Sequence, residues 1–205
     1  MSTARWPRHP SLFGLALIAL IGCGSSPDKS SPEEPSVTAA PERPAATTPA
    51  MDPAKAARVD RVRLSLEQGL DVNAADADGR TAMMMAAFEG YTEVVEVLLQ
   101  YGAEVDRLDG AGRTALMYAS SGPFPQTVEV LIENRADVDH ADTAEGWTAL
   151  MMAAAEGHRT VVELLLKHGA DIALTDQDGD SAIDHARERG QPDIVALLES
   201  WPGES

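Results

Sequence analysis

Apolar and polar positions recur with helical spacing in the middle of the chain, from Thr92 to Tyr101. The apolar residues of this stretch are Val94, Val95, Val97, Leu98 and Leu99, and the polar residues between them are Glu93, Glu96 and Gln100. At 3.6 residues per turn the first set forms one broad face and the second set the opposite face, which predicts an amphipathic helix. A shorter helix of small residues is predicted over Ala82–Phe88, with Thr81 as its N-cap and Gly90 as its stop.

This helix pair recurs along the chain with a period of 33 or 34 residues. The turn glycine before each short helix is Gly79, Gly112, Gly146 and Gly179, and Thr81, Thr114, Thr148 and Ser181 follow two residues later. One such pair is too small to bury its own apolar face, so neighbouring units must stack. The period therefore predicts an all-α repeat solenoid of helix-turn-helix units joined by short β-hairpin connections.

The turn and closing motifs resemble those of the ankyrin repeat. The turn motif reads Gly79-Arg80-Thr81-Ala82-Met83, Gly112-Arg113-Thr114-Ala115-Leu116 and Gly146-Trp147-Thr148-Ala149-Leu150, and the closing motif reads Leu165-Leu166-Lys167-His168-Gly169-Ala170-Asp171-Ile172. The resemblance covers about three quarters of the chain. It implies the ankyrin solenoid fold and a non-catalytic role in binding a protein.

The repeats give the domain boundaries. Residues 51–205 are expected to form one ankyrin-repeat domain, with an N-terminal cap repeat at 51–75, repeats at 76–108, 109–141 and 142–175, and a C-terminal cap repeat at 176–201. In the N-terminal cap, Ala54 to Val59 is expected to form the short helix, and the residues around Val62, Leu64 and Leu66 the second helix.

Two places depart from the repeat pattern. In repeat 109–141, Pro123 replaces the glycine between the helices and Arg135 replaces the glycine after them, so Asn134 or Arg135 must end the second helix with some strain. One extra residue lengthens the tip at 142–147. The loop at 120–125 and this longer tip are either shaped by a partner or products of neutral drift.

The N-terminal 22 residues have the pattern of a secretion signal. Arg5, Arg8 and His9 precede an apolar stretch from Leu12 to Ile21. The sequence Leu20-Ile21-Gly22-Cys23 resembles the bacterial lipobox, which implies cleavage before Cys23 and its lipidation with several acyl chains, palmitate among them. An ordinary signal peptide with an incidental cysteine is the alternative. Because Cys23 is the only cysteine, a disulfide framework is excluded.

The following stretch, residues 23–50, is rich in Pro, Ser, Thr and Ala and is expected to be a disordered tether. With Gly24 after the cysteine, as in the outer-membrane sorting pattern of enteric bacteria, the expected location is the bacterial cell envelope. The protein would be lipid-anchored at the outer membrane and face the periplasm.

The net charge restricts the partners. The formal charge is −17, and loss of a leader with Arg5 and Arg8 would make it about −19. Nucleic acid would be repelled, whereas a basic protein would be attracted. A simpler interpretation is that the negative charge only keeps the domain soluble.

The sequence holds no recognisable catalytic motif, so no enzyme and no cofactor are expected. Asp176 to Asp180 does not fit an EF-hand calcium loop. Six methionines of the short helices could bind a soft metal, but the same positions are expected in the core, where methionine fills gaps. They are Met83, Met84, Met85, Met117, Met151 and Met152.

Ankyrin proteins usually bind partners at the hairpin tips and along the concave face of the short helices. Carried onto this chain, the resemblance predicts three tip residues, three residues at helix ends and one arm residue as the partner-binding set. These are Arg80, Arg113 and Trp147, then Phe88, Glu89 and Glu156, and finally Leu108. Phe88 and Trp147 are expected to be exposed aromatic anchors.

These features predict a monomeric, membrane-anchored scaffold that binds another protein of the envelope. An immunity or inhibitor protein that masks a periplasmic toxin or enzyme is one alternative. An auxiliary factor that binds a metal or haem through Met and His side chains is another.

Overall fold

The structure is a computed structural model of the chain, and it describes residues 53–202 and the side chains of 55–202. Within this range the chain forms nine α-helices and no extended strand. The helices are α2 (Pro53–Glu67), α3 (Ala82–Phe88), α4 (Thr92–Gln100), α5 (Ala115–Ser120), α6 (Pro125–Glu133), α7 (Ala149–Glu156), α8 (Arg159–Lys167), α9 (Ala182–Glu188) and α10 (Pro192–Ser200). None of these helices is long and apolar enough to cross a lipid bilayer.

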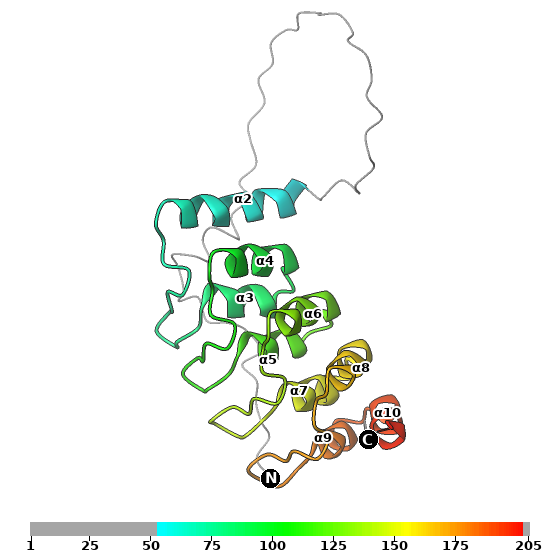
Figure 1. Cartoon of the computed structure of the whole chain (residues 1–205). Helices are drawn as coiled ribbons and strands as arrows, with labels where there is room; N and C mark the ends of the chain where they lie inside the picture. The colour runs from blue at the N-terminus through cyan, green and yellow to red at the C-terminus, as the bar shows by residue number, and fades with distance from the viewer. Residues whose placement is uncertain (1–52, 203–205) are drawn as a thin grey trace, which may run out of the picture.

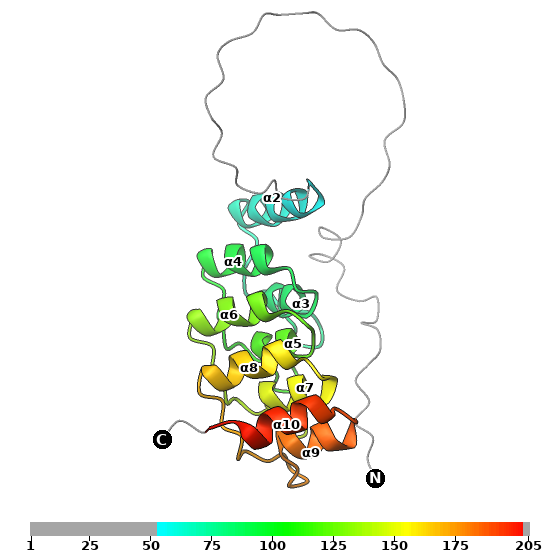
Figure 2. The same ribbon diagram turned by 90° about the vertical axis from the view of Figure 1, so that its right-hand side faces the viewer.

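The helices form two parallel layers, as the turned view in Figure 2 shows. The short helices α3, α5, α7 and α9 stack on one another as the inner layer, and α4, α6, α8 and α10 stack as the outer layer. The connecting arms project together from one edge of the solenoid (Figure 1). The predicted all-α repeat solenoid is confirmed.

Three of the four short helices follow a threonine N-cap, as the sequence predicts, and α9 follows Ser181. The hydroxyl oxygens of Thr81 and Thr148 accept the backbone amides of Met84 and Met151 at 3.4 and 3.3 Å. In return the methionine sulfur accepts the threonine amide at 3.4 Å in both repeats. Methionine thus takes the place of the Glu or Gln of an ordinary capping box.

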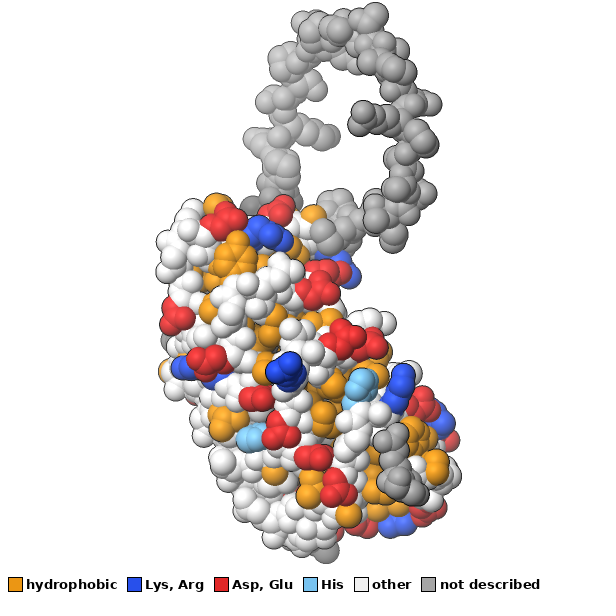
Figure 3. Space-filling view, viewed as in Figure 1, with side chains coloured by type: hydrophobic (Ala, Val, Ile, Leu, Met, Phe, Trp, Pro, Cys, Tyr) orange, Lys and Arg blue, Asp and Glu red, His pale blue; other side chains and the backbone are white. Residues whose placement is uncertain are grey.

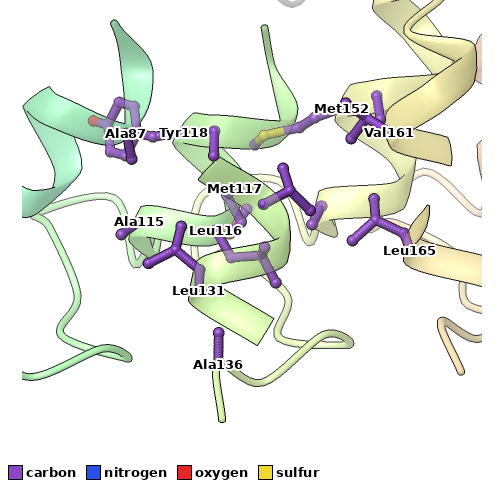
Figure 4. Packing of buried hydrophobic residues seen from close by; sticks show 14 of the residues in the cluster. Ala87, Ala115, Leu116, Met117, Tyr118, Leu131, Ala136, Met152, Val161 and Leu165 are labelled. Carbon is purple, nitrogen blue, oxygen red and sulfur yellow. The ribbon is translucent and has the colours of Figure 1, made fainter. Parts of the chain in front are cut away.

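Large side chains fill the space between the two layers (Figure 4). Leu116 and Met117 of α5 lie with Leu131 of α6 in the same apolar cluster as Met152 and Leu165 of the next repeat, and each is 2% exposed or less. Because every repeat buries its apolar face against the next one, the core continues along the whole solenoid.

The turns at the ends of the arms are joined by backbone hydrogen bonds. The amide of Gly110 donates to the carbonyl of Asp78 at 2.8 Å, and the amide of Thr143 donates to Ala111 at 3.0 Å. The amide of Gln177 donates to Glu145, within the tip that carries the extra residue, at 2.9 Å. The longer tip therefore keeps its place in the stack. The expected β-hairpins are reduced to isolated bridges, such as Ala75 with Thr81.

The first unit differs from the expectation. Ala54 to Val59 and the residues that follow do not form two helices but the single helix α2. Ala57 stands where the next repeat has the helix-ending Gly90, so nothing stops the helix there. Helix α2 packs on α4, and the guanidinium of Arg58 stacks 3.8 Å above the ring of Tyr91.

The loop at 120–125 has a structural role. The ring of Phe124 covers the Cα atoms of Gly90 and Gly122, and a Cβ atom on either glycine would collide with it. Pro125 occupies the first turn of α6, where a proline costs no hydrogen bond. Phe124 thus packs this repeat against the preceding one.

The strained helix end lies at Arg135, whose φ of 68° makes it the only left-handed non-glycine residue among those described. We expect Arg135→Gly to raise the free energy of unfolding by about 1 kcal/mol, because glycine adopts this conformation without steric cost. Urea denaturation measures the change. Asn134→Gly is the control and should bring no gain, since Asn134 has a φ of −90°. A loss of stability in Arg135→Gly would contradict the strain.

Candidate functional site

The two tip arginines are held by the turns that carry them. The Arg80 guanidinium pairs with Asp76 at 2.8 Å and with Asp78 at 2.9 Å, and its side chain is 16% exposed. Arg113 pairs in the same way with Asp109 at 3.2 Å. Both were predicted to bind a partner, but their charges are largely neutralised within the domain.

Tyr118 joins these turns to the inner helices, and the sequence interpretation missed it. Its hydroxyl donates to Asp109 Oδ2 at 2.7 Å, and its ring meets Phe88 edge-on at 6.2 Å. His185 occupies the equivalent position, with Nε2 2.9 Å from Asp176 Oδ2. The available signal was a Tyr or His nine residues after the turn aspartate, at Asp109 and Asp176.

These contacts change the acidity of the turn carboxyls. Burial alone would raise the pKa of Asp109, but hydrogen bonds from the Arg113 amide and the Tyr118 hydroxyl, together with the Arg113 charge, lower it overall. The pKa of Asp76 is lowered in the same way, since hydrogen bonds from Arg80 outweigh its burial. Burial and the bond to Asp109 raise the pKa of Tyr118 well above its usual range.

The lowered pKa values predict a loss of stability in acid. A carboxyl whose pKa is lower in the folded state than in the unfolded state stabilises the fold fully at pH values above its unfolded pKa of about 4. This stabilisation is lost as the pH falls from there through the pKa of the folded state. Urea denaturation between pH 7 and 3 should therefore show a falling free energy of unfolding below about pH 4.

Asp109→Asn should be less stable at pH 7 and should lose less on acidification, whereas Glu96→Gln on an exposed face should follow the wild type. This comparison separates the turn carboxyl from the general relief of charge repulsion. Parallel pH profiles for Asp109→Asn and the wild type would contradict the assignment.

The expected exposure of Trp147 is wrong. Its side chain is 5% exposed and packs against the imidazole of His185, with ring centroids 4.2 Å apart and the two planes inclined by 40°. His185 belongs to α9 of the next repeat, so that repeat covers the indole. Trp147 is therefore a packing residue and offers no exposed aromatic anchor.

The ends of the inner helices carry the remaining predicted residues. Phe88 at the end of α3 is partly buried, and Glu89 beside it is exposed. Glu156 ends α7 with its side chain 41% exposed, 3.8 Å from Arg189. We call Phe88, Glu89, Glu156 and Arg189 the inner-helix row. Leu108 is 44% exposed in the arm between the first two complete repeats.

Metal-binding groups are not gathered in the described part of the chain. No three side chains of His, Cys, Asp or Glu among residues 55–202 are placed to hold a metal ion. Five of the six clustered methionines are 2% exposed or less, and two of their sulfurs cap helices. Cys23, the predicted lipidation site, lies outside the described residues.

The repeats match a family model for ankyrin repeats in three overlapping copies, at residues 20–109, 51–142 and 122–202. The chain therefore belongs to the ankyrin-repeat family. Ankyrin repeats generally mediate protein-protein interaction and are typically non-catalytic, which agrees with the predicted class of function.

Individual relatives match over short stretches. Ankyrin repeat and SAM domain-containing protein 6 of Mus musculus is 41% identical over 61 residues, which is 29% of this chain and 7% of that protein. Diacylglycerol kinase iota of Homo sapiens is 40% identical over 60 residues, which is 29% of this chain and 6% of that protein. E3 ubiquitin-protein ligase mind-bomb of Drosophila melanogaster is 44% identical over 41 residues, 20% of this chain and 3% of that protein. The matched stretch is thus only a small part of the length of each of these relatives.

Proposed function

We propose that this chain is a non-catalytic scaffold of the bacterial cell envelope, anchored through lipid on Cys23, that binds another protein. The observation that carries the binding role is the stacked inner layer of an ankyrin solenoid, with the inner-helix row at the surface. The lipobox-like sequence and the Pro-rich stretch after it support the anchor and the tether.

The inner-helix row is the proposed contact surface. Phe88 supplies apolar area at the end of α3 beside the exposed Glu89, and Glu156 adds an exposed carboxylate at the end of α7. A net charge of −17 favours a basic partner, because complementary charge speeds encounter and disfavours acidic competitors. Trp147 is no longer part of the surface.

Crosslinking in intact envelopes tests this function. The wild type is compared with Glu89→Lys/Glu156→Lys, and with the matched control Glu96→Lys/Glu133→Lys on the outer helices. All four glutamates changed are exposed, so equal folding is expected and is checked by circular dichroism. We expect one protein captured by the wild type and the control but lost with the inner-helix pair.

The same captured proteins with both pairs would exclude the inner-helix row, and no specific capture would count against the scaffold. Metal release on denaturation, measured on the purified chain, tests the alternative of a metal-binding auxiliary factor. Burial of the methionines in helix caps and core gives that alternative no support among the described residues.

A further inference from the structure

A row of aliphatic side chains runs along the arms, at a surface separate from the inner-helix row. Each of the four arms carries one such residue at the same place, namely Val72, Val105, Val138 and Ile172, which we call the arm stripe. The three valines pack partly against the core, and Ile172 is 37% exposed. Leu70, two residues before Val72, is 39% exposed. The stripe therefore leaves apolar surface in contact with water in every repeat.

Exposed acidic side chains flank the arm stripe, on both sides of Val105 and Val138 and before Val72 and Ile172. The flanking residues are Asp71, Glu104, Asp106, Asp137, Asp139 and Asp171, all of them exposed. Among residues 70–75, 103–108, 136–141 and 170–175, Arg107 is the only Lys or Arg, and it pairs with Glu104 at 3.2 Å. Figure 3 shows apolar and acidic side chains side by side along the solenoid in the view of Figure 1.

The backbone holds these flanking side chains in fixed positions. Asp106 Oδ1 accepts the amide of Asp137 at 3.0 Å, and Asp139 Oδ1 accepts the amide of Asp171 at 2.9 Å. In the first arm Asn73 Oδ1 accepts the amide of Glu104 at 2.9 Å in the same manner. A surface that is already ordered loses little conformational entropy when it binds.

We propose that the arm stripe docks a cationic amphipathic segment of a partner protein. The apolar side chains of that segment cover the aliphatic row, and its Lys and Arg side chains lie over the acidic flanks. This inference rests on the proposed role as a protein-binding scaffold and names the chemistry of the partner and a second surface for it.

Charge selects this occupant over three others. An anionic membrane surface and a nucleic acid would both meet like charge along the whole stripe. A second copy that pairs stripe to stripe would place carboxylates against carboxylates, because a two-fold interface brings the same patch of both subunits together. A cationic segment with one apolar face complements both the negative charge of the flanking carboxylates and the aliphatic side chains of the arm stripe.

Binding of labelled peptides to the full-length chain carrying Cys23→Ser tests the proposal by fluorescence polarisation. The first peptide is a Leu/Lys sequence of about 20 residues, roughly 30 Å long as a helix, with its leucines on one face. The second has the same composition scrambled around the helix, and the third has Glu in place of Lys. We expect the first to bind about tenfold more tightly than the second, and the third not to bind.

Asparagine substitutions remove the charge and keep the hydrogen bonds, as Asn73 already does in the first arm. Asp106→Asn/Asp137→Asn/Asp139→Asn should weaken the Leu/Lys peptide about tenfold and reduce its salt dependence. The matched control Glu96→Gln/Glu129→Gln/Glu133→Gln removes the same charge from the outer helices and should change the affinity less than about twofold. Ile172→Ser should weaken binding several-fold without changing the salt dependence.

Three results would overturn the proposal. Equal binding of the amphipathic and scrambled peptides, or equal losses of affinity in the two triple variants, would show that net charge alone determines peptide binding. Self-association in sedimentation experiments that the arm triple abolishes would make a second copy the occupant. A crosslinked partner that depends on Glu89 and Glu156 but not on the arm triple would leave the proposed function standing while this inference fails.

Discussion

Replacing Gly112 with alanine is expected to lower the free energy of unfolding by about 3–4 kcal/mol, whereas Gly179→Ala should cost about 1–2 kcal/mol. Both glycines occupy the same place in the turn and have left-handed φ angles of 80° and 88°. A Cβ atom on Gly112 would lie 2.7 Å from the amide nitrogen of Thr143 in the next turn. A Cβ atom on Gly179, in the last of the repeats that the structure describes, would have nothing within 4 Å.

Urea denaturation followed by circular dichroism measures both changes. The common part of the two costs is the left-handed strain, so their difference reports the packing of one turn against the next. Gly79→Ala should resemble Gly112→Ala, because its Cβ would lie 2.8 Å from the amide nitrogen of Gly110. Equal losses at Gly112 and Gly179 would show that the turns do not pack as described.

The repeated parts of the fold could be predicted from the sequence because each rests on a local rule that recurs. The turn glycines, the threonine caps and the apolar spacing of the outer helices all specify the same unit, and the unit must stack to bury its core. Strain at Asn134 or Arg135 was expected from the same reasoning, since a repeat without its glycine must still end its helix, and the structure has the left-handed conformation at Arg135. Agreement across repeats gave these predictions their strength.

Individual departures from the repeat were harder to predict. Ala57 in place of a glycine joined two expected helices into α2, a change that the apolar pattern alone does not reveal. Trp147 follows a turn glycine, where the two preceding repeats place the partly buried Arg80 and Arg113, but it lies in the core beside His185. Burial of that kind depends on the next repeat in space, and sequence spacing does not report it.

The ion pairs of the tip arginines could not be predicted from their place in the repeat either. Their position suggested anchors for a partner, yet Arg80 and Arg113 are paired with turn carboxylates of the same repeat. The carboxylates of the arms have few cations near them, so the surface charge available to a partner is negative. This shift from basic tips to acidic arms underlies the proposal of a cationic partner segment.

Truncation of Trp147 is the second change with a large expected effect. Trp147→Ala should lower the free energy of unfolding by about 3–5 kcal/mol, because it removes a buried ring and leaves a cavity beside His185. Leu108→Ala is the matched control, since Leu108 is 44% exposed and its truncation should cost less than about 1 kcal/mol. Urea denaturation followed by circular dichroism gives both values without relying on tryptophan fluorescence.

Trp147→Phe separates packing from recognition. It keeps an aromatic ring against His185 and should recover most of the stability lost in Trp147→Ala. Crosslinking of the folded Trp147→Phe protein should equal that of the wild type, because the indole is not at the surface. A stable Trp147→Phe protein that no longer captures the partner would contradict the buried position, since a residue inside the stack acts on binding only through the fold.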